Sequence, residues 1–401
     1  MNPHKLLLNS FNAAIAAVDP LHIVPRHLPK PPAGRTLVVG AGKAAAAMAL
    51  AVENYWPETA ALNGIVVTRY GHGIPTNRIT VIEAGHPLPD EQGEQAARNI
   101  LAEVNKLGAD DLLLCLLSGG GSSLLSLPVA NVALHDLQAV TQELLRSGAT
   151  IQEINTVRKH LSVIQGGRLA ASCRAPILAL VISDVTGDDP THVASGPCAP
   201  DPTTYQQALA ILERYQISAP AAVMDILLAG KQGKLAETPK PENAVFGKVE
   251  NRVIARAHDS LVAAGEFFRS QGIPAAILGD AVTGEARAVA RVYAALVREI
   301  RHYGHPWKPP VVLISGGETT VTVNGNGRGG RNAEFLLSLA IELDGAKDVY
   351  ALACDTDGID GSEHNAGAVV TPDSLRRAEQ LGINAAAALA DNDSYTFLLR
   401  R

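Results

Sequence analysis

Short runs of Val, Leu and Ile alternate along the chain with Ala-rich stretches whose apolar residues recur at helical spacing. Apolar runs of this length predict strands buried on both faces, and the stretches between them predict helices that cover a parallel sheet. In the first half, the expected strands are residues 36–40, 64–68, 79–84, 111–118 and 175–183. The expected helices are residues 43–55, 90–107, 133–146, 154–173 and 204–214. The pattern therefore predicts an α/β fold that begins with a doubly wound, Rossmann-like parallel-sheet domain.

A polar, proline-bearing stretch over residues 230–248 interrupts this alternation and predicts a linker. We place a boundary near residue 240, which gives domains over residues 1–240 and 241–401. Beyond it, the expected strands are residues 252–257, 274–279, 310–318 and 349–358, with helices over 259–271 and 284–302. The stretch "TTVTVNGNG" alternates with period two and ends in Asn-Gly, which predicts an antiparallel hairpin. We therefore expect a second, smaller α/β domain with a mixed sheet.

Composition narrows the class of partner. The net charge is −6 with no block of Lys and Arg, which argues against nucleic acid or an anionic membrane surface and favours a small molecule. No apolar run approaches the roughly 18 residues of a membrane span, and the first residues predict an amphipathic helix rather than a secretion signal. The 4 cysteines lack metal-ligand spacing, so we expect them to be reduced and the location to be cytoplasmic. A homodimer is one assembly that the sequence leaves open.

Three predicted junctions before helices are rich in glycine: "VVGAGKAAAAMA" (38–49), "LLSGGGSSLL" (116–125) and "NGNGRGGRNAEFLL" (324–337). Glycine lets backbone N–H groups approach a ligand, and a following helix adds free donors and the positive end of its dipole. A tight turn without a ligand explains any single junction equally well, but three in one chain favour a phosphate or carboxylate site. The candidate phosphate-binding residues are Gly40, Gly42, Ser118, Gly119, Gly120, Gly121, Ser122 and Ser123.

The first junction does not decide which anion is bound. "GAGKAA" matches the dinucleotide fingerprint, but the next strand ends in Thr68 and Arg69, where that fingerprint needs an acid. An arginine at this position can bind the 2′-phosphate of NADP, so Arg69 leaves an NADP site as an alternative. The P-loop pattern is absent because Ala44 follows Lys43. Lys43, directly after the turn, is a candidate phosphate ligand, with a solvated lysine as the alternative.

Acidic residues follow the last strand of the first domain. Asp184, Asp188 and Asp189 lie within six residues of one another in "VISDVTGDDPTH". Clustered carboxylates repel one another, so a bound cation or a substrate hydroxyl is one reason to keep them. The alternative is that they act as turn and capping residues.

A second acidic run, residues 353–367, repeats this pattern with Asp355, Asp357 and Asp360. An EF-hand would need Glu at the position of Ala366. We therefore reject calcium and keep magnesium as a candidate.

Basic residues offer positive charge for a phosphoryl group. Arg328 and Arg331 stand among the glycines of the third junction, and arginine binds phosphate in bidentate geometry. The stretch 154–171 also carries charged residues, and we expect these to be solvated on the surface of a helix: Arg158, Lys159, His160 and Arg168. Three loop histidines have no nucleophile paired with them in the sequence: His72, His86 and His192.

The order of the motifs resembles the glycerate 2-kinase family, the class II glycerate kinases with a C-terminal MOFRL domain. The similar segments run from about residue 5 to about residue 397, and they include "VVGAGKAA", "LLSGGGSSLL", "ISDVTGDDPTHVASGPCAPDPTT", "GRGGRNAEFLLSLA" and "DTDGIDGSEHNAGAVV". The resemblance implies transfer of the ATP γ-phosphoryl group to D-glycerate, giving 2-phosphoglycerate, with Mg²⁺, in a cleft between two α/β domains. Some members are labelled hydroxypyruvate reductase, particularly in tartrate utilisation, so an NAD(P)H-dependent reductase of hydroxypyruvate or tartronate semialdehyde is the alternative.

Residue roles follow from the same resemblance. The catalytic lysine of the family falls on Lys43, and its arginine from the second domain falls on Arg331. We expect Asp184 to position the substrate hydroxyl, and Asp188 and Asp189 to hold the metal. Members of the family continue beyond "DNDSYTF" with a Gly/Thr-rich segment and a last strand, whereas this chain ends in "LLRR". The resemblance therefore implies a truncated second domain.

Overall fold

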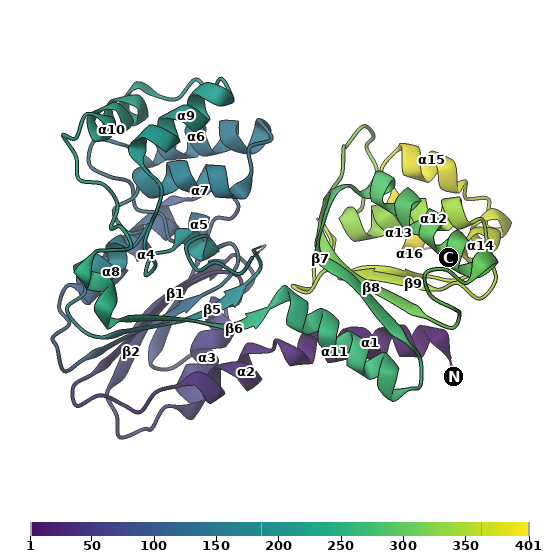
Figure 1. The fold of residues 1–401 in the computed structure, drawn as a ribbon, viewed down its shortest axis with the longest axis horizontal. Helices are drawn as coiled ribbons and strands as arrows, with labels where there is room; N and C mark the ends of the chain where they lie inside the picture. Colours follow the sequence, from purple (N-terminus) through teal and green to yellow (C-terminus); the bar gives the residue numbers. More distant parts are fainter. Residues whose placement is uncertain (1, 186, 362, 400–401) are drawn as a thin grey trace. The chain divides into compact units, whose positions relative to one another are not determined.

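The computed structural model describes residues 2–185, 187–361 and 363–399. The chain forms two compact units, one of residues 19–256 and one of residues 1–18 together with 257–401 (Figure 1). The chain thus passes to the second unit at residue 257, after the polar stretch in which we placed the boundary. The first helix joins the second unit, which the sequence pattern does not reveal.

A six-stranded parallel sheet forms the centre of the unit of residues 19–256. Its strands are β1 (Thr36–Ala41), β2 (Leu62–Arg69), β3 (Ile79–Ala84), β4 (Leu112–Leu117), β5 (Ile177–Ser183) and β6 (Val249–Arg256). They lie in the order β3-β2-β1-β4-β5-β6, with every neighbouring pair parallel. The first five strands and the doubly wound class are confirmed. The strand expected at residues 252–257 pairs with β5 as the last strand of this sheet and does not open the second domain.

Helices cover both faces of this sheet (Figure 1). Alternate residues of β1, β4 and β5 point toward α4 (Glu91–Val104) and α8 (Arg168–Ser172), where Val39, Cys115 and Ala179 join one buried cluster. The helix α3 (Ala45–Tyr55) packs on the opposite face. The strands read as continuous apolar runs because both of their faces are buried.

Four further helices form a layer with its own apolar core: α6 (Leu134–Arg146), α7 (Ile151–His160), α9 (Tyr205–Arg214) and α10 (Ala221–Lys231). The single helix expected over 154–173 is wrong, since the structure has α7 and α8 with a break between them. Gly166 and Gly167 adopt φ values of 60° and 80° in that break. This left-handed backbone ends a helix, and glycine adopts it at little cost.

Helices and short strands alternate in the other unit as well. Its elements are α1 (Pro3–Ala17), α11 (Ala257–Ser270), β7 (Ala275–Glu285), α12 (Ala286–Tyr303), β8 (Val312–Thr320), α13 (Arg331–Leu343), β9 (Ala351–Cys354), β10 (Gly367–Val370), α14 (Ser374–Gln380), α15 (Ala385–Ala390) and α16 (Ser394–Leu399). β7 pairs in parallel with β8, and β9 pairs antiparallel with β10. Both strand directions therefore occur, in two separate sheets. α1 lies along α11, although the two helices are far apart in the sequence (Figure 1).

The expected hairpin after β8 is wrong. The amides of Asn324 and Gly325 both donate to Asn392 Oδ1, at 2.8 and 3.0 Å, and the amide of Gly327 donates to Asp391 O at 2.8 Å. The backbone amides of this segment therefore bond to the loop before α16. In a hairpin, a second strand would have accepted these hydrogen bonds. A contact so distant in the sequence overrides the local turn signal.

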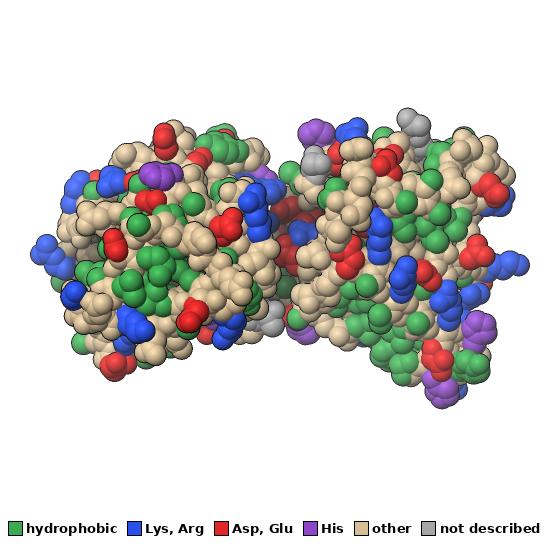
Figure 2. Space-filling view, turned by 90° about the horizontal axis from the view of Figure 1, so that it is seen from above, with side chains coloured by type: hydrophobic (Ala, Val, Ile, Leu, Met, Phe, Trp, Pro, Cys, Tyr) green, Lys and Arg blue, Asp and Glu red, His purple; other side chains and the backbone are tan. Residues whose placement is uncertain are grey.

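Among the helices that the structure describes, none is by itself long and apolar enough to cross a membrane. Residues Pro3–Ala17 and Pro20–His27 reach the required length and composition only together, as a pair bent by 47°. On the face of each unit in Figure 2, hydrophobic side chains form separate patches with acidic and basic side chains between them.

Candidate functional site

Two of the glycine-rich junctions meet where the strand order reverses. β1 and β4 are neighbours, and their carboxyl ends carry the turns at residues 40–44 and 118–121. The amide of Lys43 donates to Gly119 O at 2.8 Å, and the amide of Ala44 donates to Ser118 Oγ at 3.1 Å. A Cβ on Gly42 would lie 2.1 Å from the same Ser118 Oγ. Ligands of doubly wound sheets bind at this kind of reversal point.

Close packing accounts for several of the glycines. A Cβ on Gly40 would lie 2.4 Å from Leu116 O, and one on Gly121 would lie 2.8 Å from Ala41 O and 2.5 Å from Ala194 Cβ. Contacts this short do not occur for real Cβ atoms. These two glycines therefore let neighbouring backbones approach one another. At these positions the alternative explanation, a tight turn that binds no ligand, accounts for the glycine.

Gly119 and Gly120 are different, because they are half-exposed and their amides donate no hydrogen bond to any described residue. A Cβ on Gly119 would lie 1.7 Å from Asp184 Oδ2, and one on Gly120 would lie 3.4 Å from Lys43 Cγ and 3.1 Å from His86 Cε1. Side chains from the ends of three strands thus surround two available amides. The structure brings the predicted Lys43 and Asp184 to the same turn. His86, one of the three loop histidines, lies there as well.

The serines of this turn are engaged with their surroundings. Ser123 Oγ lies 2.9 Å from His86 Nδ1, and Ser195 Oγ donates to Ser122 Oγ at 2.9 Å. Ser118 and Ser123 are buried, whereas Ser122 is half-exposed. In this arrangement the buried hydroxyls hold the turn in shape.

A strained loop packs against the turn. Ala194, Ser195 and Gly196 have φ values of 50°, 58° and 57°. Two consecutive non-glycine residues in the left-handed region are uncommon, and such strain gathers at functional sites. Ser195 is fully buried, and its carbonyl accepts a hydrogen bond from the amide of Gly166 at 2.9 Å. The sequence pattern around "HVASGP" gives no sign of this strain.

The two predicted metal ligands already have partners within the chain. Asp188 lies 3.3 Å from Arg256 Nε, and Asp189 Oδ1 accepts a hydrogen bond from the amide of Thr191 at 2.9 Å. Over residues 2–185, 187–361 and 363–399, no group of three or more His, Cys, Asp and Glu side chains is placed to hold a metal ion. Magnesium bound with a nucleotide usually needs only one or two carboxylates besides the phosphates. The exposed carboxylate of Asp184 fits that mode better than Asp188, which is paired with an arginine.

Arg331, in the other unit, is the first residue of α13. Its guanidinium donates to Asp355 Oδ2 at 2.9 Å and also to Glu318 Oε1. Burial acts to lower the pKa of Arg331, but the hydrogen bonds that it donates to Asp355 and Glu318 raise it overall. Asp360 accepts hydrogen bonds from backbone amides at the start of the helix, including that of Ala333 at 2.9 Å. The third aspartate of this acidic run, Asp357, accepts the amide of Ile359 at 3.2 Å, so all three have partners within the chain.

The other arginine of this junction, Arg328, pairs with Glu363 and lies over the ring of Tyr395, 4.9 Å from its centroid. These contacts fix its guanidinium within its own unit. They favour a structural role for this side chain.

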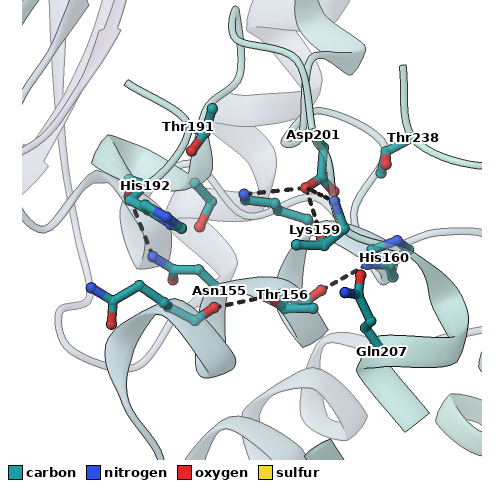
Figure 3. A network of polar contacts seen from close by, with 12 residues as sticks. Asn155, Thr156, Lys159, His160, Thr191, His192, Asp201, Gln207 and Thr238 are labelled. Atoms are coloured by element: carbon teal, nitrogen blue, oxygen red, sulfur yellow. Dashed lines mark hydrogen bonds and ion pairs between the residues drawn. The ribbon is translucent and has the colours of Figure 1, made fainter. Parts of the chain in front are cut away.

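Three basic residues of α7 are buried and Arg168 of α8 is half-buried, so the expectation of a solvated helix surface is wrong. Arg158, Lys159 and His160 are only 7%, 1% and 0% exposed. This helix packs in the interior of the four-helix layer, and its polar side chains meet loop residues there (Figure 3). The amphipathic pattern alone could not show that its polar face is covered.

Lys159 and Asp201 form a buried ion pair, 3.4 Å apart. Burial lowers the pKa of Lys159, and the charge of Asp201 opposes that shift. Burial acts to raise the pKa of Asp201, but the charge of Lys159 and hydrogen bonds from Thr203 hold it below its usual value. Asp201 Oδ1 accepts both the amide and the hydroxyl of Thr203, at 3.0 and 2.6 Å. The pair anchors the loop after residue 196 to α7.

Fold and site together define a doubly wound α/β protein with a glycine-rich, lysine-bearing turn at the point where the strand order reverses. Residues 6–228 match the model of a domain of unknown function, DUF4147, and residues 311–401 match the MOFRL family. The chain therefore belongs to the family that contains the glycerate 2-kinases, as the motifs predicted.

Individual relatives cover nearly the whole chain. A protein of Agrobacterium vitis, provisionally named hydroxypyruvate reductase, is 50% identical over 99% of this chain and 89% of its own length. The D-glycerate 2-kinase of Thermotoga maritima is 40% identical over 98% of this chain and 92% of its own. A crystal structure of glycerate kinase from the same organism has a TM-score of 0.85 and 38% identity, covering 99% of this chain and 93% of that one.

Proposed function

We propose that the protein is an ATP-dependent kinase that phosphorylates D-glycerate to 2-phosphoglycerate. The observation that carries this proposal is the turn at residues 119–120, where two available amides meet the side chains of Lys43 and Asp184. Phosphoryl transfer needs positioning and charge neutralisation more than covalent chemistry. The glycerate kinases among the relatives support the choice of reaction and of acceptor.

In this mechanism the amides of Gly119 and Gly120 donate to oxygens of the ATP phosphates. The ammonium group of Lys43 neutralises charge that develops on the transferring group, as a preorganised cation does at little reorganisation cost. Asp184 accepts a hydrogen bond from the substrate hydroxyl and orients it toward the γ-phosphorus. His86 and the serines hold the turn in the shape that this requires.

Magnesium accompanies ATP in this proposal and, when bound, neutralises phosphate charge. Asp184 and Asp189 are the carboxylates that would hold it, since each has an exposed side chain. Asp188 would first have to release Arg256.

Arg331 is the second proposed cation. Because its guanidinium is held by Asp355 and Glu318, it reaches a phosphate only by exchanging at least one of them. Glu318 is the easier one to exchange, because its side chain is 75% exposed. Arg331→Lys keeps the charge but loses the bidentate geometry. We expect this variant to lower kcat while the KM for ATP stays unchanged.

The alternative function is an NAD(P)H-dependent reductase, which the names of the Agrobacterium relatives favour. The end of β2 carries no acid that could bind the ribose hydroxyls of NAD. Thr68 stands there, and its hydroxyl donates to Lys43 O at 3.4 Å. Arg69 Nε, which would have to read an NADP phosphate, donates to His72 Nε2 at 2.7 Å. The kinase is therefore the better supported function.

One assay with two arms separates the two functions. Purified protein is given D-glycerate, ATP and Mg²⁺ in one arm, and hydroxypyruvate or tartronate semialdehyde with NADH or NADPH in the other. We expect ADP and 2-phosphoglycerate in equal amounts in the first arm only. Oxidation of the nicotinamide without formation of ADP would establish the reductase.

The proposal places the enzyme in the cytoplasm, where thiols are kept reduced. The cysteines at positions 115, 173, 198 and 354 are all free thiols in the structure.

A further inference from the structure

Arg158 is a buried cation without a carboxylate partner among the residues that the structure describes. Its side chain is 7% exposed, and the one hydrogen bond that it makes to a described residue runs from Nη1 to Asn155 Oδ1, at 3.4 Å. Burial alone lowers the pKa of Arg158 to about 10, and no described carboxylate offsets that shift. A buried charge is costly unless it is paired, so native proteins rarely keep one without a reason.

Nearby cations show that the same region can satisfy a buried charge. Lys159, the next residue, pairs with Asp201. Arg168 donates to two backbone carbonyl oxygens, at 2.6 and 2.5 Å, and to Tyr205 OH at 3.3 Å. Of these three cations, only the side chain of Arg158 has neither a carboxylate nor a backbone carbonyl as acceptor among the described residues.

A chain of hydrogen bonds joins Arg158 to the candidate active site. The side chain of Asn155 accepts a hydrogen bond from Arg158 Nη1 at 3.4 Å. It donates one to His192 O at 3.3 Å, which Figure 3 shows. Three residues later in the same loop, Ser195 donates to Ser122 beside the triple glycine. Nδ1 of His192 is buried and has no hydrogen-bond partner among the described residues. The guanidinium and this ring nitrogen are two polar groups from adjacent segments; among the described residues the first has one hydrogen-bond partner and the second has none.

We propose that Arg158 binds the carboxylate of the acceptor substrate and so selects a 2-hydroxy acid. This inference rests on the proposed function, because it gives the kinase the part of its site that recognises the acid. A guanidinium and a carboxylate form two parallel, charge-assisted hydrogen bonds. Fixing the carboxylate also fixes the hydroxyl on the adjacent carbon, and that hydroxyl is the one to be phosphorylated.

A phosphate of ATP is the other anion that a guanidinium could take. The phosphates already have the amides of Gly119 and Gly120 and the ammonium group of Lys43, whereas the substrate carboxylate has no other cation in this unit assigned to it. The observations therefore favour the carboxylate, and the experiment below separates the two anions.

The test measures binding, so it does not depend on turnover. D-glycerate and ATP are each titrated by calorimetry into the wild-type protein, Arg158→Gln, Arg158→Lys and the control Arg214→Gln, which removes an arginine that is 66% exposed. We expect Arg158→Gln to weaken D-glycerate binding about 10- to 100-fold and to leave ATP binding unchanged. Its thermal unfolding midpoint should stay equal or rise, because the substitution removes a buried charge that no described carboxylate offsets. Arg158→Lys should also weaken D-glycerate binding, and Arg214→Gln should change neither affinity.

Several outcomes would overturn the proposal. They are a wild-type protein that does not bind D-glycerate, unchanged D-glycerate affinity in Arg158→Gln, loss of ATP affinity in its place, and a lower unfolding midpoint with both affinities intact. Failure of the proposed kinase activity looks different, because D-glycerate would then bind through Arg158 while the wild-type protein forms no ADP.

Discussion

At the scale of single residues, the ion pair of Lys159 and Asp201 shows how the fold holds the loop that follows the strained segment. Both side chains are at most 1% exposed. Removing one partner of such a pair leaves the other charge buried and uncompensated. We expect Asp201→Asn to lower the free energy of unfolding by about 3 to 5 kcal/mol, as measured by urea denaturation. A loss below about 1 kcal/mol would show that the pair behaves like an exposed one.

The same carboxylate predicts a pH dependence. The folded protein holds the pKa of Asp201 below its unfolded value. The contribution of the Asp201 carboxylate to the free energy of unfolding is therefore fully present above the unfolded pKa, near 3.9. That contribution is lost as the pH falls through the lower, folded pKa. The difference in stability between the wild-type protein and Asp201→Asn should therefore be constant from about pH 7 to pH 5 and narrow below about pH 4. A difference that is already shrinking near pH 6 would contradict this assignment.

At the scale of elements, the triple-glycine turn needs glycine for two reasons, close packing at one position and room for a site side chain at another. The sequence could not separate these two reasons. Gly121 lies against backbone and a short side chain, whereas Gly119 faces the end of the exposed Asp184 side chain. Gly121→Ala should therefore lower the free energy of unfolding by about 1 to 3 kcal/mol through overpacking.

Gly119→Ala should instead displace the Asp184 carboxylate, changing stability little while lowering kcat on the order of 100-fold, because small misplacements of reacting groups are costly. Gly247→Ala is the control, since no atom lies within 4 Å of its Cβ and its φ is not positive. Urea denaturation and initial rates on all three variants test this division. Equal effects of the substitutions at 119 and 121 on both quantities would refute it.

The sequence predicted the elements whose signals are local. Five strands of the first sheet and the helix after Lys43 follow from apolar runs that end at small residues. The break between α7 and α8 and the segment after β8 did not follow, because they depend on left-handed glycines and on hydrogen bonds to residues far along the chain. Lys43 and Asp184 were recognisable as strand-end residues. His86, Ser195 and Arg158 were not, since their positions depend on tertiary packing.

At the scale of the whole molecule, an ATP site whose backbone amides and lysine lie in the unit of residues 19–256 should couple ATP binding to the stability of that unit. A ligand that binds only the folded state adds RT ln(1 + [L]/Kd), about 2.7 kcal/mol at 100 times Kd. We expect Mg·ATP to raise the unfolding midpoint of the wild-type protein in a concentration-dependent way, by differential scanning fluorimetry, and NADPH to leave it unchanged. A shift with NADPH alone would favour the reductase.

The most direct test of the account is the initial rate of ADP formation from D-glycerate, ATP and Mg²⁺ in three proteins: wild type, Lys43→Ala and Lys106→Ala. Lys106 is an exposed lysine paired with Glu103, so its loss controls for charge alone. We predict that the wild type and Lys106→Ala turn over alike, and that Lys43→Ala is slower by about 100- to 1,000-fold in kcat while remaining folded. Full activity in Lys43→Ala, or no ADP from the wild type under any of these conditions, would contradict the claim that this turn is where phosphoryl transfer takes place.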